Sequence, residues 1–438
     1  MTGIEQLNTD KTEKLFARIY GEDNIGEQKK RWADLIQKFY KRWGNKKNIR
    51  LFSSPGRSEI CGNHTDHNNG KTLGASIQLD CIAVVIPSSD NKIYITDYSY
   101  NKDFQIDLNK DLREESGGTK DSRALLCGIA QGFTNAGFNI SGFKGCFTSS
   151  VIPAAGVSSS AAFEMLVCGI INNLYNGGSI QIEKMAAIGQ YAENNYWGKK
   201  SGMLDQMACA AGGLAAFDFE NPASPRIEKI PFDFAAQKYR IILVNSGNGH
   251  ADLTEEYSSI PNEMKQVAGF FGKDALRGIP LETIVNNLSA IRAQCGDRAA
   301  LRSLHFIMEN ERVLAQIEAL KKNDFLRFLS LITESGNSSW KWLQNVYVPQ
   351  AKAVHQSVSV NLALTEIFIK NNCAGGTAAC RIHGGGFAGV IQTFLPENFV
   401  DCYTAWMQNA LKPAAVETPA AKVFSMSVRP EGLVEIDF

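Results

Sequence analysis

The chain has 438 residues, a length that is typical of two domains rather than one. Lys and Arg together number 45, as do Asp and Glu, so no overall field favours nucleic acid or an anionic membrane, although a local basic pocket stays possible. Residues 1–24 mix acids and bases without an apolar core, and no window reaches about 18 apolar residues. We therefore expect a cytoplasmic protein without a signal peptide or a membrane span.

The first third of the chain alternates helical and extended patterns. Apolar residues at helical spacing predict two amphipathic helices within residues 11–43. A short strand, Arg50 to Ser54, is expected to end at Pro55 and Gly56. Two β-rich runs, 79–86 and 92–97, flank a turn-rich segment and predict a hairpin. Residues 104–108 are expected to continue this sheet, and a helix over 122–136 and a strand over 142–149 are expected to follow.

The stretch from Pro153 to Ala162 consists almost entirely of small residues and runs into an apolar helical segment. Small side chains let a bulky anion approach the backbone N–H groups, and a helix that begins near Ser158 adds its unpaired amides and the positive end of its dipole. This describes a phosphate-binding loop. A Ser-rich turn that caps a core helix explains the same residues, and the stretch alone does not decide between the two.

The second half has its own pattern. Helical periodicity covers 182–196, and the Pro-rich segment 221–225 is the best boundary signal in the chain. We therefore predict two domains, 1–225 and 226–438. In the second, strands are expected at 240–245, 387–394 and 423–428, and long amphipathic helices within 288–331, which together indicate an α+β unit. The ten cysteines include no C-x-x-C pair and favour reduced, mostly buried thiols.

Ionisable and amide side chains crowd the segment 57–67. Zinc ligation is one interpretation, but no Cys or His partner at a recognised spacing follows. A sugar site fits better because Asp, Asn, His and Arg read several hydroxyls directionally, and a solvated loop is the remaining alternative. The residues are Arg57, Glu59, Asn63, His64, Asp66 and His67.

Two other features bear on chemistry. Asp205 is flanked by an almost uncharged segment, so its carboxylate is expected to be partly buried beside a cation, although a helix cap or a structural ion pair explains a lone Asp equally well. Three consecutive glycines, 384–386, indicate a close backbone approach or a tight turn. Gly70-Lys71-Thr72 is not a P-loop because Thr65 stands where the motif needs its first Gly.

Together these stretches resemble the GHMP small-molecule kinases, and specifically the galactokinases. Residues 56–70 are similar to the signature G-R-x-N-x-x-G-E-H-x-D-Y-x-x-G, and 153–162 to the nucleotide loop P-x-x-x-G-L-S-S-S-A-A. Residues 202–206 resemble the G-x-x-D-Q segment, 381–389 the glycine-rich third motif, and 245–257 a further family stretch. Five matches in the family's order cover most of the chain.

The resemblance implies a two-domain α+β kinase, with an N-terminal α/β domain that contains a left-handed β-α-β unit and a ferredoxin-like C-terminal domain. It implies ATP and Mg²⁺ as cofactors and phosphorylation of a sugar at its anomeric hydroxyl. Asp205 would accept the O1 proton, and Arg57 would keep Asp205 ionised. The implied sugar ligands are Asn63, His64, Asp66, Gly202 and Tyr257. The implied nucleotide ligands are Pro153, Gly156, Val157, Ser158, Ser159, Ser160 and Ala161, with Ser160 and Glu164 for the metal.

The signature departs from the family at positions that bear on the sugar. The usual Glu is Asn63, the usual Asn is Glu59, and the usual Tyr is His67. Because the family's Glu is expected to bind hydroxyls near C6, a neutral amide there would tolerate a C6 carboxylate, and plant galacturonate kinases are similar in lacking that Glu. Galactose, galacturonate and a non-catalytic sugar and ATP sensor therefore all remain open. Mevalonate or homoserine kinases fit less well because they lack the His64 and Asp66 cluster.

Overall fold

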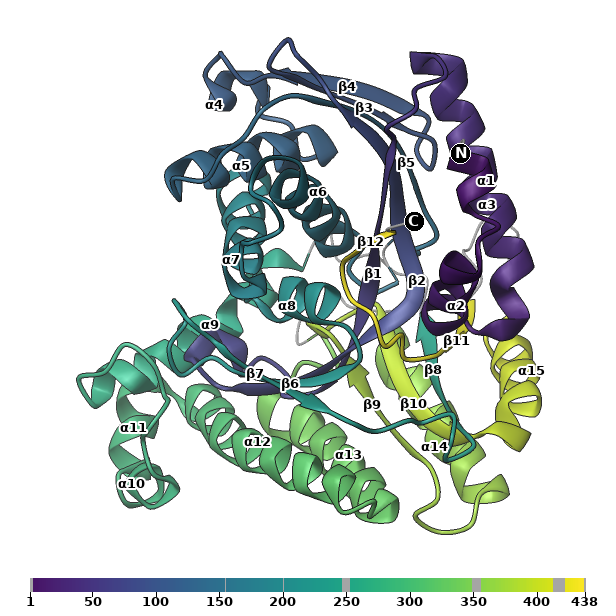
Figure 1. Cartoon of the computed structure of the whole chain (residues 1–438). Helices are drawn as coiled ribbons and strands as arrows, with labels where there is room; N and C mark the ends of the chain where they lie inside the picture. The colour runs from purple at the N-terminus through teal and green to yellow at the C-terminus, as the bar shows by residue number, and fades with distance from the viewer. Residues whose placement is uncertain are drawn as a thin grey trace.

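The computed structural model describes residues 3–153, 155–199, 201–245, 253–348, 356–412 and 422–436. Within these ranges, two β-sheets with helices on their faces make up the fold (Figure 1). The expected mixture of helix and sheet is confirmed. All ten cysteines are free, and most are buried, as predicted.

The first sheet is built around the long strand β2 (Lys71–Pro87). Its order is β12-β1-β2-β5-β3-β4, and the first half of β2 pairs with β6, which pairs with β7. The other strands are β1 (Arg50–Cys61), β3 (Lys92–Asp97), β4 (Lys102–Asp107), β5 (Phe143–Ser149), β6 (Leu214–Asp218), β7 (Arg226–Ile230) and β12 (Val434–Ile436).

The strand predicted to end at Pro55 and Gly56 instead continues to Cys61. A register shift against β2 between Pro55 and Arg57 accommodates the proline, which cannot donate to the ladder. A Cβ atom on Gly56 would lie 2.7 Å from the carbonyl oxygen of Val157, so only glycine lets β1 pass this close to the loop before α6. The extension carries Arg57 into the middle of the molecule.

The predicted hairpin between β2 and β3 is wrong in its pairing. The chain does reverse at residues 88–91, as the turn residues indicate, but β5 lies between the two strands. It pairs antiparallel with β2 and parallel with β3. Local turn chemistry cannot predict that a strand more than fifty residues further on will enter the gap.

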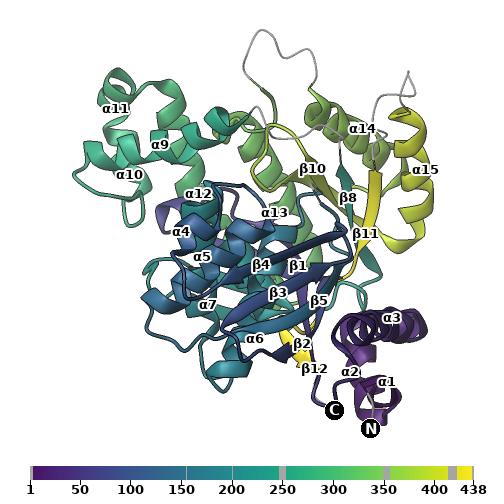
Figure 2. The ribbon, with the colours of Figure 1, turned by 90° about the horizontal axis from the view of Figure 1, so that it is seen from above.

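Helices cover both faces of the first sheet (Figure 2). On one face, α2 (Asp10–Tyr20) and α3 (Ile25–Trp43) bury Phe16, Trp32 and Phe39. The two helices predicted within 11–43 are thus confirmed, and a short α1 (Gly3–Gln6) precedes them. The other face is covered by α4 (Leu112–Glu115), α5 (Ser122–Asn135), α6 (Ser159–Tyr175), α7 (Ile182–Ala192) and α8 (Leu204–Ala211).

A buried charge cluster centred on Asp80 fastens α2 and α3 to the sheet. Its carboxylate accepts hydrogen bonds from Arg31 (2.6 Å), Tyr20 (2.7 Å), Ser53 (2.6 Å) and Arg429 (3.0 Å). Burial alone would raise the pKa of Asp80, but the two guanidinium groups outweigh it and hold the pKa below its ordinary value. The N-terminal helices, the sheet and the C-terminal segment therefore meet at one carboxylate.

We expect Asp80→Asn to lower the free energy of unfolding by about 3–5 kcal/mol, because it leaves two guanidinium groups near a neutral amide. The folded pKa lies below the unfolded value, so this stability is present above the unfolded pKa and is lost as the pH falls through the folded one. Urea unfolding at neutral and acidic pH measures both effects. Asp34→Asn, at an exposed position on α3, is the matched control, and an equal loss in both variants would contradict the prediction.

The second sheet is smaller and antiparallel, in the order β11-β8-β10-β9. Its strands are β8 (Tyr239–Asn245), β9 (Ala379–His383), β10 (Val390–Pro396) and β11 (Lys422–Met426). The strand expected from Phe387 begins only at Val390, because Phe387 has a left-handed backbone (φ 62°). On its two faces pack α14 (Ser357–Asn372) with α15 (Val400–Ala410), and α12 (Asp297–Lys321) with α13 (Phe325–Ser338).

Three more helices, α9 (Thr254–Phe270), α10 (Leu281–Asn286) and α11 (Leu288–Cys295), pack with α12 in a separate apolar cluster. The division at residue 225 stays a prediction. Both β7, which follows it, and β12, near the end of the chain, pair within the first sheet. In the part of the chain that the structure describes, no helix is long and apolar enough to cross a membrane.

Candidate active site

A cavity of about 740 Å³ lies where the two sheets meet, and its size suits a small molecule with a phosphate chain. Its wall combines the end of β1, the loop before α6, the segment before α8, Tyr257 of α9 and the turn after β9. Segments far apart in the sequence therefore share one wall, and the ordered motifs of the sequence converge here.

Arg57 and Asp205 form an ion pair at the centre of this wall. Arg57 Nε donates to Asp205 Oδ1 at 2.7 Å, and its Nη1 donates to the carbonyl of Gly156. Burial raises the pKa of Asp205, but Arg57 and Lys199 outweigh it and bring the pKa to about 2. The cation expected beside Asp205 is thus Arg57, and the carboxylate is ionised at neutral pH.

The loop before α6 delivers backbone and hydroxyl groups to the cavity. Gly156 (φ 70°) and Ser158 (φ 54°) have left-handed backbones, which turn the chain into α6. The Ser158 hydroxyl does not cap the helix but donates to Asp205 Oδ2. Because the first turn of a helix leaves its N–H groups without intrahelical acceptors, α6 presents a positive end here.

The predicted nucleotide residues are not all at the cavity surface. Gly156, Ser158, Ser159 and Ser160 line it. Pro153 is exposed outside the cavity, whereas Val157 and Ala161 are buried in the apolar core. Val157 still contributes its carbonyl, which accepts the backbone N–H of Arg57 at 3.1 Å.

Two buried carboxylates stand behind Ser160. Its hydroxyl donates to Glu193 Oε1 at 2.8 Å, and Lys199 reaches the same oxygen at 2.9 Å. Glu164 accepts from Gln206 at 2.8 Å through Oε2, while its buried Oε1 has no partner in the described part of the chain. Burial and the nearby Glu193 raise the pKa of Glu164 well above its ordinary value. Lys199 bonds to Glu193, and Glu164 has no cation bonded to it among the described residues.

The other end of the cavity holds the predicted sugar residues. His64, Asp66, Gly202 and Tyr257 line it, and the rings of His64 and Tyr257 lie 5.1 Å apart. A Cβ atom on Gly202 would lie 1.8 Å from Asp66 Oδ2, so the carboxylate packs directly on the glycine backbone. Asn63 also lines the cavity, but its side chain is fully buried among protein groups. Of the family stretch 245–257, residues 246–252 lie outside the described residues.

A second cavity of about 530 Å³ adjoins the first, because both are lined by Lys120, Ser159, Ser160 and Trp197. Tyr100, Phe104 and Phe163 give it an aromatic wall. The N-terminus of α6 therefore stands between a polar cavity and an aromatic one.

The comparisons with known proteins agree with this geometry. A family model described as the galactokinase galactose-binding signature matches residues 37–87, and one for the GHMP kinase N-terminal domain matches residues 123–213. A galactokinase of Streptomyces coelicolor is 29% identical over 84% of this chain and 90% of its own. A galactokinase of Glaesserella parasuis is 30% identical over 80% of this chain and 85% of its own. The chain belongs to the galactokinase family.

The fold agrees with that of a solved member of the galactokinase family. The structure of Lactococcus lactis galactokinase complexed with galactose superposes with a TM-score of 0.76 over 92% of this chain and 99% of that one, at 20% identity. The GHMP kinase fold class inferred from the motifs is thereby confirmed.

Sequence reasoning missed part of this galactokinase-family site. Glu193 and Lys199 were not predicted, although they complete the charged group behind Ser160. Glu193 begins a π-helical turn (Glu193–Trp197) that continues α7, and an acidic residue there resembles any surface helix position. A lysine six residues after it was the only signal. The carbonyl groups of the glycine-rich turn accept hydrogen bonds from Asn63 and His64, which the sequence alone does not indicate.

Proposed function

We propose that the protein is an ATP-dependent sugar kinase that phosphorylates galactose at the anomeric hydroxyl. The observation that carries the proposal is the Arg57–Asp205 pair, which stands in one cavity between the predicted sugar residues and the N-terminal end of α6. Both relatives cited above are named galactokinases, which supports the same assignment. We also propose that the protein acts in the cytoplasm.

In the proposed reaction, Asp205 accepts a hydrogen bond from the anomeric hydroxyl and orients its oxygen toward the γ-phosphate. A carboxyl of pKa about 2 is a weak base, which suits a loose transition state that demands little proton removal before the phosphoryl group moves. Arg57 holds the carboxylate in place and stabilises negative charge during transfer. His64, Asp66, Gly202 and Tyr257 would hold the sugar.

ATP would lie with its phosphates at Gly156, Ser158, Ser159 and Ser160 and its base in the aromatic second cavity. The residues behind Ser160 also fit Mg²⁺, because Glu164 has a buried oxygen without a partner among the described residues. Burial and the nearby Glu193 raise the pKa of Glu164, so a bound cation would stabilise its ionised form. Ser160 and Glu164, with Glu193, would hold the ion. Mg²⁺ supplies charge neutralisation for the phosphates.

The alternative of a non-catalytic sensor is not favoured by any feature of the site. Asp205, held by Arg57 beside the predicted sugar residues, is a part that phosphoryl transfer needs and that the binding of sugar and ATP alone does not. The choice between galactose and galacturonate depends on the surroundings of Asn63.

The direct test incubates the protein with ATP, Mg²⁺ and one sugar at a time and measures the release of ADP. The sugars are galactose, galacturonate, N-acetylgalactosamine, glucose and arabinose. We expect turnover on galactose, with the product identified as the 1-phosphate by its stability to borohydride. Omitting Mg²⁺ is expected to abolish turnover. No ADP release on any sugar, with sugar and ATP still bound, would replace the kinase assignment by a sensor.

A further inference from the structure

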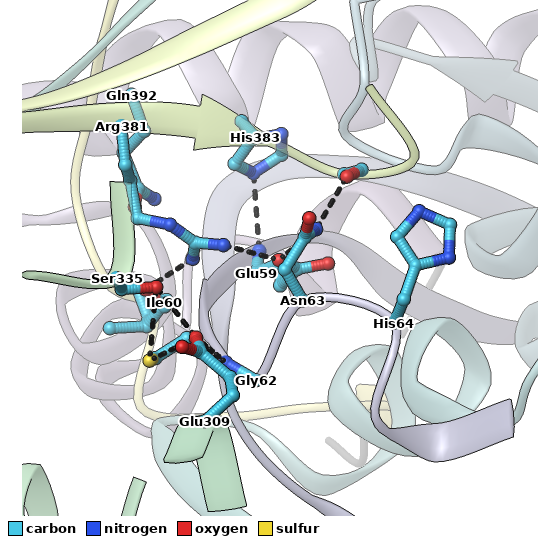
Figure 3. Close-up of polar contacts among 12 residues, drawn as sticks. Glu59, Ile60, Gly62, Asn63, His64, Glu309, Ser335, Arg381, His383 and Gln392 are labelled. Atoms are coloured by element: carbon cyan, nitrogen blue, oxygen red, sulfur yellow. Dashed lines mark hydrogen bonds and ion pairs between the residues drawn. The ribbon is translucent and has the colours of Figure 1, made fainter. Parts of the chain in front are cut away.

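Glu59 and Asn63 hold the reverse of what the galactokinase signature places at their positions. The signature has an amide first and a carboxylate four residues later, whereas this chain has the carboxylate first and the amide second. In the structure the two side chains touch, with Asn63 Nδ2 donating to Glu59 Oε1 at 2.9 Å (Figure 3). The two departures are therefore one local arrangement and not two independent changes.

Both amide hydrogens of Asn63 are committed within the protein. Nδ2 donates to Glu59 Oε1 and, at 2.6 Å, to the carbonyl of Gly384. A carbonyl can only accept, so the contact with Gly384 fixes which end of the amide is nitrogen. The remaining atom, Oδ1, accepts from Asn345 Nδ2 at 2.7 Å. Asn63 thus has no side-chain N–H left for a substrate carboxylate.

Glu59 is held from the opposite side. Arg381 Nη2 donates to Glu59 Oε1 at 3.0 Å, and Nη1 of the same guanidinium donates to the carbonyl of Ile60 at 2.7 Å. Arg381 is fully buried and Glu59 nearly so, and the two form an ion pair. Glu59 lines the cavity beside Asn63, and Arg381 balances its charge there.

The pair also fixes the turn that follows β9. Gly384 is bound through its carbonyl to Asn63, and the next carbonyl, of Gly385, accepts from His64 Nε2 at 2.8 Å. The donation by Nε2 makes Nδ1 of His64 an acceptor, and Nδ1 has no partner in the described part of the chain. The turn therefore presents His64 to the sugar as a neutral hydrogen-bond acceptor.

We propose that Glu59 and Asn63 act as an exchanged carboxylate–amide pair that positions the 384–386 turn and His64, and that the resulting sugar end accepts a neutral galactose-type hexose and not a hexuronate. This inference rests on the proposed kinase function. It reverses the expectation from the sequence that an amide at position 63 would tolerate a C6 carboxylate.

The charges around the cavity agree with this substrate class. Of the cationic side chains that line it, Arg57 is paired with Asp205 and Lys199 with Glu193. Lys120 also lines the aromatic cavity, so it lies toward the nucleotide. His67 faces the Tyr257 hydroxyl at 3.2 Å, and its Nε2 lies 3.8 Å from the Asp66 carboxylate. In the described part of the site, a uronate would meet Asp66 without a cation of its own.

The test is a double-mutant cycle of Asn63→Glu, Glu59→Asn and the two together. In Asn63→Glu, a second carboxylate replaces the donor that faces Glu59 and the Gly384 carbonyl, so we expect a lower Tm that falls further as the pH rises and both carboxylates ionise. Glu59→Asn leaves Arg381 buried without its counter-ion and should also lower the Tm. The double variant, which restores the family arrangement, is expected to recover part of the summed loss.

Steady-state kinetics with the sugar provide a second measurement on the same variants. Each single variant is expected to raise the KM for galactose by about tenfold or more with a much smaller change in the KM for ATP, and the double variant is expected to recover part of the rise. Wild type should prefer galactose over galacturonate by at least about 100-fold in kcat/KM. If Asn63→Glu does not fold, Glu59→Gln with Asn63→Ala provides a milder cycle.

A matched control combines Glu59→Gln with Asn172→Ala, a buried asparagine that bonds to Ile180 and Met185 and shares no partner with Glu59, so these effects should add. Additive losses in the Glu59 and Asn63 cycle would overturn the paired role. Turnover of galacturonate as fast as galactose would overturn the substrate class. Failure of every sugar to release ADP would refute the kinase function, whereas the Tm cycle needs no activity and would still decide whether the pair exists.

Discussion

Asp205→Asn is expected to lower kcat for galactose by about 10³-fold or more and to lower the Tm, because Arg57 loses its counter-ion, while ATP binding changes little. Asparagine keeps the shape of the side chain but cannot take the proton of the anomeric hydroxyl. It also removes the charge that fixes Arg57, whose Nε and Nη2 both lie within 2.7 Å of Asp205 Oδ1. Steady-state ADP release and calorimetric titration with ATP measure kcat and ATP binding separately.

The pH profile of the wild type adds a check on Asp205. With a pKa of about 2, the carboxylate stays ionised through the neutral range, so its titration should leave no inflection there. Asp401→Asn, on the exposed side of α15, is the matched control and should retain full activity. Activity of Asp205→Asn within tenfold of wild type would exclude the proposed role. A loss of ATP binding as large as the loss of kcat would instead indicate that the ion pair is structural.

Gly202→Ala is expected to raise the KM for galactose by about 100-fold or more with little effect on the KM for ATP. The added methyl group would lie 1.8 Å from Asp66 Oδ2 and 2.4 Å from Asp66 Cγ, so the carboxylate must leave its position. A displacement of about 1 Å at a group that orients the substrate is sufficient for a loss of this size. Initial rates with galactose and ATP varied independently measure the two constants.

Gly26→Ala is the matched control, because a methyl group on Gly26 of α3 meets nothing within 4 Å. It should leave both constants unchanged. If Gly202→Ala behaved like this control, Asp66 would not hold the sugar. An equal rise in both KM values would point to a general disturbance of the segment before α8.

Local patterns predicted the helices well and the strand pairing poorly. Phe16 and Trp32 fall on the buried faces of α2 and α3, as helical spacing implies. The entry of β5 between β2 and β3 could not be predicted, because hydrophobic periodicity indicates which residues are buried but not which strand lies beside them. The continuation of β1 past Pro55 depends in the same way on a partner, since β2 supplies the ladder on both sides of the register shift.

The candidate site, too, was predicted only in part from the sequence. Arg57 and Asp205 were predicted as partners because a carboxylate in apolar sequence needs a cation, and the family motifs indicated which one. The state of Asn63 was not accessible, because residue type alone suggested a free amide at the sugar. Its commitment to Glu59 and Gly384 depends on a turn more than 300 residues away in the chain. Glu193 was not predicted, because no neighbouring residue indicates that the end of α7, where it lies, is buried.

The pairing of β12 with β1 bears on how the protein is made. The residues of β1, from Leu51 to Ser53, take their second neighbour from Val434 to Ile436, which the ribosome makes more than 380 residues later. Arg429, which completes the Asp80 cluster, is made only shortly before them. One edge of the strand that carries Arg57 therefore stays open until these residues emerge, and an open edge is a template for pairing with other chains. The need for chaperones during synthesis should accordingly last until residues 429–436 have been made, although the strand that carries Arg57 is made long before.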